Sequence, residues 1–266
     1  DPPPIRIPVR AGTMVPNPNY LKKYNLSHYI TKRNQYYCAT LSELVLQVKH
    51  NRESLVKRVA TRLNLFFDCI LIDEFQDFRE YDYELILTLA NQLQDLVGDY
   101  HQHSVSATNN SGKPFKKRTD DVSYDEFIAE LKNAGFKVDL TTLDKSRRCS
   151  SEICQYVREK LGINISSHGN NIGSVIWVDE NAAAILEDQQ IIKLLYKDAA
   201  RYSFRAINWS YSKGDTMDAA CVILTDNFEK LADDEFSTKG ISESTINKLY
   251  VAMTRSCGNL YLMRSS

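Results

Sequence analysis

Two adjacent carboxylates at the end of an apolar run are the first residues that could do chemistry. The run from Phe66 to Ile72 is apolar except for Asp68, and Asp73 and Glu74 follow it directly. Carboxylates at the carboxyl end of a strand lie where open α/β sheets place their ligands. One of them can hold Mg²⁺ while the other polarises an attacking water. The alternative is an acidic turn that only closes a strand.

A second polar group follows the next apolar run. Leu96 and Val97 lead into Gly98-Asp99-Tyr100-His101-Gln102. Glycine allows a tight turn after a strand, and the side-chain amide of Gln102 can both donate to and accept from a phosphate or its attacking water. A polar turn with its glutamine in solvent is the alternative, because such turns are common.

Arginines stand at two helix ends. Arg147 and Arg148 come just before a helix whose expected cap is Ser150, and Arg255 ends a later helix. A guanidinium is well suited to charge that develops on a γ-phosphate. The alternative is that they are ordinary surface residues, as arginines at such positions often are.

The stretch from Trp209 to Asp218 combines aromatic, hydroxyl and small residues. Its hydroxyls can donate to a phosphate backbone, and Trp209 or Tyr211 can stack on a base or a ribose. An aromatic residue at a strand edge belongs to the core more often than to a ligand site, because aromatic rings dominate core burial.

Apolar runs alternate with amphipathic periods along the chain, and these elements must position the polar groups. We expect helices over 41–63 (one helix or a pair), 81–93, 123 onward, 150–161, 187–202 and 242–254. We expect strands over 66–72, 96–97, 136–143, 175–178, 222–224 and 260–262. The strand 66–72 has the content of a strand buried on both faces. The alternation predicts an α/β fold with parallel sheets and flanking helices.

The domain organisation follows from changes in composition. Six of the seven prolines fall at or before Pro18, which predicts an extended lead-in over residues 1–40. Residues 41–120 are expected to form a first lobe and 121–266 a second lobe. Residues 108–121 form a polar loop with four basic residues, which is either solvated surface or a nucleic-acid contact.

Overall composition is that of an ordinary globular protein. The 266 residues are 43% hydrophobic and 25% charged, with a formal net charge of −1. A balance near neutrality neither requires nor forbids a nucleic-acid partner. The sequence shows no signal segment or membrane span, and its six cysteines are scattered without metal-ligand spacing. We therefore expect a cytoplasmic protein that has no membrane partner and no structural zinc.

Five ordered motifs resemble those of superfamily 1 helicases of the UvrD/Rep type. They are Asp-Glu-Phe-Gln-Asp at 73–77, Gly-Asp-x-x-Gln at 98–102, Leu-x-x-x-x-Arg-x-Ser at 143–150, Ser-Lys-Gly-x-x-x-Asp at 212–218 and Tyr-Val-Ala-Met-Thr-Arg at 250–255. The resemblance implies two RecA-like lobes, ATP and Mg²⁺ as cofactors, and single-stranded or partly duplex DNA as a partner. It implies an enzyme that hydrolyses ATP to move on single-stranded DNA.

The resemblance also implies a role for each matching residue. The catalytic residues would be Glu74 as general base, with Arg148 and Arg255 as arginine fingers. The nucleotide-binding residues would be Asp73 (also the Mg²⁺ ligand), Gln76, Gln102, Gly214 and Thr216, and the DNA-binding residues Trp209, Ser210, Tyr211 and Ser212.

The sequence departs from the family pattern in three places. No Gly-x-x-x-x-Gly-Lys-Ser/Thr phosphate loop occurs in the chain, and the nearest candidate, Arg10 to Thr13, lacks the lysine. Thr216 replaces the usual glutamate of the fifth motif, and Arg147 replaces the usual aromatic residue of the fourth. We therefore expect an incomplete first lobe and a piece that is inactive alone.

The missing loop also bears on partners and on the pathway. The expected partners are a chain that carries the loop, or a nuclease, with a role in DNA repair or phage defence. The alternative function is a non-catalytic helicase-like module that binds DNA or protein.

Overall fold

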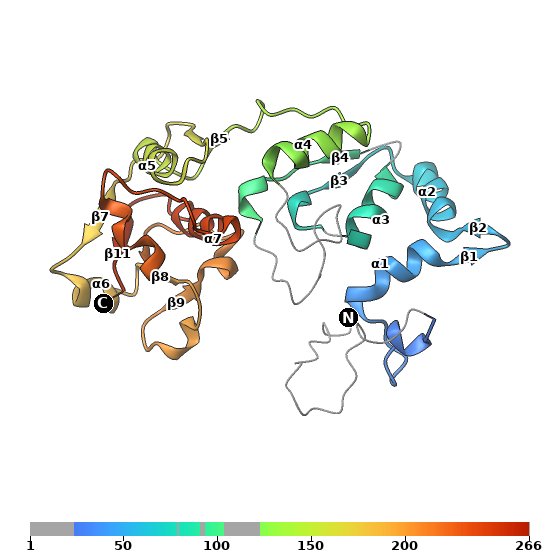
Figure 1. Cartoon of the computed structure of the whole chain (residues 1–266), viewed down its shortest axis with the longest axis horizontal. Helices are drawn as coiled ribbons and strands as arrows, with labels where there is room; N and C mark the ends of the chain where they lie inside the picture. The colour runs from blue at the N-terminus through green and yellow to red at the C-terminus, as the bar shows by residue number, and fades with distance from the viewer. Residues whose placement is uncertain (1–23, 79, 91–93, 104–122, 266) are drawn as a thin grey trace. The chain divides into compact units, whose positions relative to one another are not determined.

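The computed structural model describes residues 24–78, 80–90, 94–103 and 123–265, which belong to two compact units (Figure 1). The first unit comprises residues 1–98 and 105–136, and the second comprises 99–104 and 137–266. Residues 1–23 of the expected proline-rich lead-in and all of the basic loop at 108–121 lie outside the described residues.

The first unit contains helices and two small sheets. Its elements are α1 (Cys38–Gln47), β1 (Lys49–His50), β2 (Glu53–Ser54), α2 (Leu55–Phe66), β3 (Ile70–Ile72), α3 (Glu80–Ala90), β4 (Gln94–Leu96) and α4 (Tyr124–Asn133). The expected helical stretch 41–63 is thus a pair of helices joined by an antiparallel β1–β2 hairpin. Asn51 and Arg52 both have positive φ at the hairpin turn, as the tight turns that suit hairpin twist require.

The strand before the acidic pair is shorter and more exposed than the sequence predicts. Helix α2 continues to Phe66, and β3 pairs in parallel only with β4. Leu71, in the middle of β3, is 73% exposed. The prediction of a strand buried on both faces is therefore wrong for the described residues, because the two-stranded sheet is covered on one face only.

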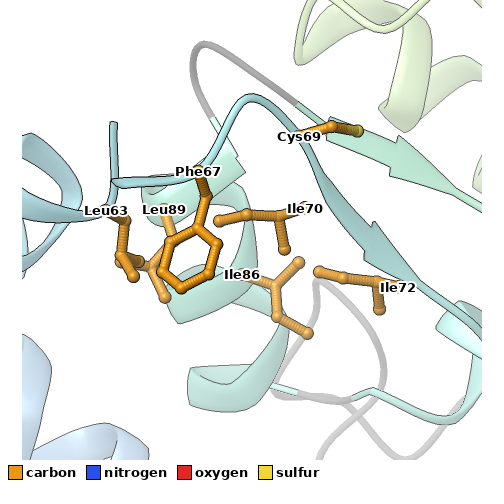
Figure 2. A pocket seen from close by; sticks show the side chains of 7 residues that line it. All are labelled: Leu63, Phe67, Cys69, Ile70, Ile72, Ile86 and Leu89. Carbon is orange, nitrogen blue, oxygen red and sulfur yellow. The ribbon is translucent and has the colours of Figure 1, made fainter. Parts of the chain in front are cut away.

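The covered face of β3 borders an apolar pocket of about 370 Å³ (Figure 2). Ile70 and Ile72 point from β3 toward Ile86 and Leu89 of α3, and Phe67 and Leu63 close the side near α2. Packing of the partly buried Ile70 and Ile72 against α3 fixes the direction of β3 and hence the place of the residues that follow it, whereas Phe67 at the pocket edge is 55% exposed.

Helix α4 begins at a capping box, as the sequence predicts. The Ser123 hydroxyl accepts from the Glu126 amide, and the Glu126 carboxylate accepts from the Ser123 amide. Phe127 of α4 packs against Phe75 with ring centroids 6.3 Å apart, so α4 belongs to the first unit. The observed division thus differs from the expected lobe boundary at residue 121, and residues 99–103 belong to the second unit instead of the first.

The second unit is built on a five-stranded parallel sheet in the order β7-β11-β10-β8-β9. Its elements are β5 (Lys145–Ser146), α5 (Ser151–Leu161), β6 (Ser166–Ser167), β7 (Val175–Val178), α6 (Ala182–Glu187), β8 (Ile192–Leu195), β9 (Ala206–Asn208), β10 (Ala220–Ile223), α7 (Glu243–Met253) and β11 (Leu260–Met263). Short strands β5 and β6 pair separately.

Helices cover both faces of this sheet. Apolar residues of α5 and α7 form one core with β8, β10 and β11. On the other face, Ile185 and Leu186 of α6 pack against Ile191, Cys221 and Met263. The predicted fold class, an α/β fold with parallel sheets flanked by helices, is confirmed.

Two predicted elements of the second unit are wrong. Residues 136–143 form a turn instead of a strand, because the Asp139 carboxylate accepts from the amides and hydroxyls of Thr141 and Thr142. Residues 187–202 contain β8 instead of a helix. Residues 191–195 are all buried, as is typical of a strand that pairs on both sides within a parallel sheet.

Lys193 interrupts the apolar run of β8, so the sequence pattern does not indicate a buried strand there. It is 0% exposed in the middle of the strand, and its ammonium donates to the Asp188 carbonyl. Burial lowers the pKa of Lys193. None of the helices in the described part of the chain is long and apolar enough to span a bilayer.

Candidate functional site

The acidic pair lies at the carboxyl end of β3, as expected. Glu74 has φ +55° and precedes the 3₁₀ turn Phe75–Asp77. The Glu74 amide donates to Asp73 Oδ1 at 2.8 Å, and Gln76 Nε2 donates to Glu74 Oε2 at 2.6 Å. Because Phe75 and Gln76 are buried, the turn has a fixed shape that holds the Glu74 carboxylate.

Gly98 allows the close approach of the second strand end to this turn. The Phe75 amide donates to the Val97 carbonyl at 3.0 Å. A Cβ atom on Gly98 would lie 2.4 Å from Gln76 Oε1 and 3.3 Å from the amide nitrogens of Phe75 and Gln76. A side chain at position 98 would therefore push the Gln76 amide away from Glu74.

Asp73 fits a single carboxylate ligand for Mg²⁺. The residue is exposed, and its Oδ2 makes no hydrogen bond among the described residues. Mg²⁺ keeps several waters and is usually bound through one or two carboxylates together with substrate phosphates. Within the described ranges, no group of three or more His, Cys, Asp or Glu residues forms a complete metal cage. The donor set therefore suits an ion that arrives with a phosphate.

Arg255 lies at the end of α7 in the second unit and is 1% exposed. Its Nε donates to the Val251 carbonyl at 2.8 Å. Its Nη2 lies 3.3 Å from Gln102 Oε1 and 3.2 Å from the Thr254 hydroxyl. These contacts hold the plane of the guanidinium in one orientation.

Asp99 orders the segment that carries Gln102. The Asp99 carboxylate accepts from the Tyr250 hydroxyl at 2.8 Å, from Gln102 Nε2 at 3.0 Å and from the His101 amide at 3.0 Å. Because Asp99 takes the amide hydrogens of Gln102, Gln102 Oε1 faces Arg255. The Gly-Asp-x-x-Gln and Tyr-Val-Ala-Met-Thr-Arg motifs are thus joined within one unit.

Tyr100 and His101 also hold the segment 99–102 against α7. The Tyr100 hydroxyl donates to Glu243 at 2.8 Å, and the His101 ring lies edge-on to Tyr250 with centroids 6.0 Å apart. Burial lowers the pKa of His101, so its ring is neutral at neutral pH. Burial, reinforced by the Asp99 charge, raises the pKa of Tyr250, so its hydroxyl stays a donor.

Arg148 also contacts Thr254 at the end of α7, next to Arg255. Its Nε donates to the Thr216 hydroxyl at 2.9 Å, and its Nη1 donates to the Thr254 carbonyl at 3.2 Å. The second bond places a cation at the carboxyl end of α7, where a helix favours positive charge. The Ser146 hydroxyl accepts from the amides of Arg148 and Cys149 and sets the turn before α5.

Positive charge is concentrated at this cluster. Burial and then the charge of Arg148 lower the pKa of Arg255 to about 10, which leaves it protonated at neutral pH. Among the described residues, neither Arg148 nor Arg255 forms an ion pair with a carboxylate. The neighbouring Cys149 thiol has a pKa lowered to about 7, mainly by a hydrogen bond with Cys154. Within the described part of the chain, the two guanidiniums are thus outside any ion pair, although the nearby Asp99 charge acts on the pKa of Arg255 in the opposite direction to Arg148.

The stretch expected to contact DNA divides into buried and exposed residues. Trp209 is 0% exposed, and its Nε1 donates to the Leu194 carbonyl at 2.9 Å. Ser212 is also buried, and its hydroxyl donates to the Trp209 carbonyl. Their expected DNA contact is therefore corrected: Trp209 is a core residue between Tyr196 and Phe228, and Ser212 ties the turn behind it.

The other residues of this stretch remain accessible. Ser210 is half-buried, and Tyr211 is 66% exposed. Gly214 is exposed with φ +86°, a conformation that favours glycine. Thr216 is exposed and bonded to Arg148, so the departure from the family glutamate puts a hydroxyl beside this arginine.

The structure brings several predicted residues together within the second unit. Gln102, Arg148, Thr216 and Arg255 meet around the end of α7, while Asp73, Glu74 and Gln76 meet in the first unit. Sequence reasoning assigned no role to Asp99, Tyr250 or Thr254. All three lie inside the quoted motifs, so their place in the motifs was the available signal.

Comparison with known proteins agrees with the motifs. Residues 17–104 match the family model of the UvrD/REP helicase N-terminal domain, which is less than half of the chain. A search of curated protein sequences finds no significant match.

Several solved helicase structures are similar to the chain. The helicase nonstructural protein 10 of an arterivirus, solved with DNA, has a TM-score of 0.47 at 15% identity over 73% of this chain and 39% of that one. The PRRSV helicase has a TM-score of 0.43 at 17% identity over 73% of this chain and 34% of that one. The chain thus spans well under half the length of either helicase.

Proposed function

We propose that this chain, which resembles superfamily 1 helicases of the UvrD/Rep type, is the part of an ATP-dependent DNA helicase or translocase that completes hydrolysis and couples it to DNA. The family match and the ordered motifs support a helicase-like function. ATP and Mg²⁺, movement on single-stranded DNA, a cytoplasmic location and a role in DNA repair or phage defence are further parts of the proposal.

One observation carries the proposal most directly. Arg148 and Arg255 converge with Gln102 on the end of α7, and no carboxylate among the described residues pairs with either guanidinium. Two buried or half-buried cations next to each other repel, so a bound anion would relieve the cost of placing them together. A γ-phosphate is the anion that this pattern of donors suits.

Each of the functional residues would have its own role in the proposed hydrolysis. Glu74, held by Gln76, would accept a proton from the attacking water. Arg148 and Arg255 would stabilise the charge that develops on the transferred phosphoryl group. Asp73 would hold Mg²⁺, which neutralises phosphate charge when it is bound.

The proposal requires a phosphate loop from polypeptide beyond these 266 residues, because the sequence contains no such motif. Three large apolar side chains of the first unit, Leu65, Phe66 and Leu71, are 75%, 73% and 73% exposed and are available for contact with such polypeptide. We use the name loop-bearing protein for the 266-residue chain together with a polypeptide that carries the phosphate loop, whether the two are covalently joined or mixed as separate chains.

The test of this function is ATP hydrolysis with and without single-stranded DNA. We expect the loop-bearing protein to hydrolyse ATP with stimulation by DNA, and the 266-residue chain to show little or no turnover alone. The Glu74→Gln variant removes the proton acceptor at nearly constant shape, so it should reduce turnover to background. Robust turnover by the 266-residue chain that vanishes in Glu74→Gln would contradict the need for an added loop.

A non-catalytic helicase-like module that binds DNA or protein is the second candidate. The absence of a phosphate loop from the sequence favours it. It predicts that Glu74→Gln leaves every measurable property of the loop-bearing protein unchanged, whereas the ATP-dependent function predicts loss of turnover with nucleotide binding retained.

A further inference from the structure

The connection between β8 and β9 lies outside the helicase motifs (Figure 1). Its sequence contains aromatic and basic residues. Tyr202 is 50% exposed, and Phe204 beside it is half-buried. Their ring centroids lie 5.0 Å apart with an angle of 31° between the planes. The Tyr202 ring is therefore accessible to solvent, and it packs against the Phe204 ring.

Three basic residues flank this aromatic pair. Lys197, Arg201 and Arg205 are all exposed, and Asp198 is the one acid between residues 197 and 205. Arg201 lies 3.6 Å from Asp198, with 78% of the arginine side chain exposed. Asp198 offsets one of the three positive charges, which leaves a formal charge of +2 over residues 197–205. The connection therefore has a positive surface around the rings.

The connection is held at both ends, so its side chains are presented by a fixed backbone. The Ala199 amide donates to Asn208 Oδ1 at 2.8 Å, and the Lys193 amide of β8 donates to the Arg205 carbonyl at 3.2 Å. Between them, Ala199–Arg201 forms a 3₁₀ turn. Preorganisation of this kind lowers the entropy cost of binding a flexible ligand.

We propose that the β8–β9 connection is a stacking site for single-stranded nucleic acid, with Tyr202 on Phe204 as the platform and Lys197, Arg201 and Arg205 as the phosphate contacts. Aromatic faces stack on bases of any sequence, and nearby cations follow the sugar–phosphate backbone. Charge complementarity favours a polyanion over an apolar protein surface. The inference rests on the proposed function for the presence of DNA, and it adds a contact outside the motif residues.

Binding of a fluorescein-labelled oligothymidine strand to the 266-residue chain, measured by fluorescence anisotropy, tests the site. Tyr202→Ala should weaken binding about tenfold, because one stacked base is lost. Arg201→Ala should lower the slope of log K against log salt by about 0.7, because one phosphate contact is lost on a single strand. Tyr36→Ala is the matched control, since Tyr36 is also 50% exposed but lies in the first unit, and it should bind as wild type.

The outcomes separate this inference from the proposed function. If the wild type binds and both Tyr202→Ala and Arg201→Ala bind equally well, the stacking site is overturned while the helicase function stands. If the wild type does not bind the strand, the stacking site and the DNA part of the proposed function both fail, whereas ATP hydrolysis by the loop-bearing protein remains a separate measurement. Equal weakening by Tyr36→Ala would also overturn the assignment.

Discussion

Replacement of Arg255 by lysine is expected to lower ATP turnover by the loop-bearing protein about 10³-fold, with a smaller effect on nucleotide affinity. Lysine keeps the positive charge but offers a point charge in place of a planar fork. Arg255 now bonds the Val251 carbonyl through Nε while its Nη2 faces Gln102 and Thr254. A lysine cannot hold all these contacts and still direct a donor at a phosphate. Steady-state kinetics over a range of ATP concentrations measures the effect.

Two further variants make this prediction decisive. Arg148→Ala removes the second, half-buried guanidinium and should also cost about 10³-fold in turnover, which guards against a folding defect at the buried Arg255. Arg264→Ala is the control, because it removes a half-exposed guanidinium that pairs with Asp179 elsewhere in the second unit. Losses below about tenfold at both Arg148 and Arg255 would refute their role in hydrolysis.

Trp209→Ala is expected to destabilise the second unit by about 3–5 kcal/mol. The indole is 0% exposed, its Nε1 bonds the Leu194 carbonyl, and its ring meets Tyr196 edge-on at 5.4 Å. Alanine would leave a cavity and remove the hydrogen bond to the Leu194 carbonyl of strand β8. Urea denaturation followed by circular dichroism measures the loss.

Tyr211→Ala provides the comparison for Trp209. Tyr211 is 66% exposed, so its removal should change stability by no more than about 0.5 kcal/mol. If Trp209→Ala kept full stability and lost only DNA binding, the core assignment of Trp209 would be wrong.

Capping residues predicted the starts of two helices better than periodicity predicted the strands. The caps at Ser123 and Ser150 were readable because a serine precedes an amphipathic period at each site, and both serines accept from backbone amides. Strand β8 was not predicted because Lys193 interrupts its apolar run. The aliphatic part of the Lys193 side chain is buried in the core. Exposure of Leu71 was unpredictable because it depends on which strands complete the sheet.

In the candidate site too, the contacts between residues far apart in the chain could not be predicted from the sequence. Sequence motifs selected Gln102, Arg148 and Arg255, but not Asp99 and Tyr250, which aim Gln102 at Arg255 through two hydrogen bonds. Such positioning arises from tertiary contacts between residues far apart in the chain. The expected DNA contact of Trp209 was wrong, because an aromatic residue near a strand end serves either a core or a ligand and its place in the sequence does not distinguish the two.

The most direct test of the central claim is calorimetric titration of the loop-bearing protein with a non-hydrolysable ATP analogue, with and without Mg²⁺. The account predicts saturable binding that Mg²⁺ strengthens, that Glu74→Gln retains, and that the Arg148→Ala and Arg255→Lys variants weaken only modestly. Absence of binding at millimolar nucleotide would contradict an ATP-dependent function for these residues.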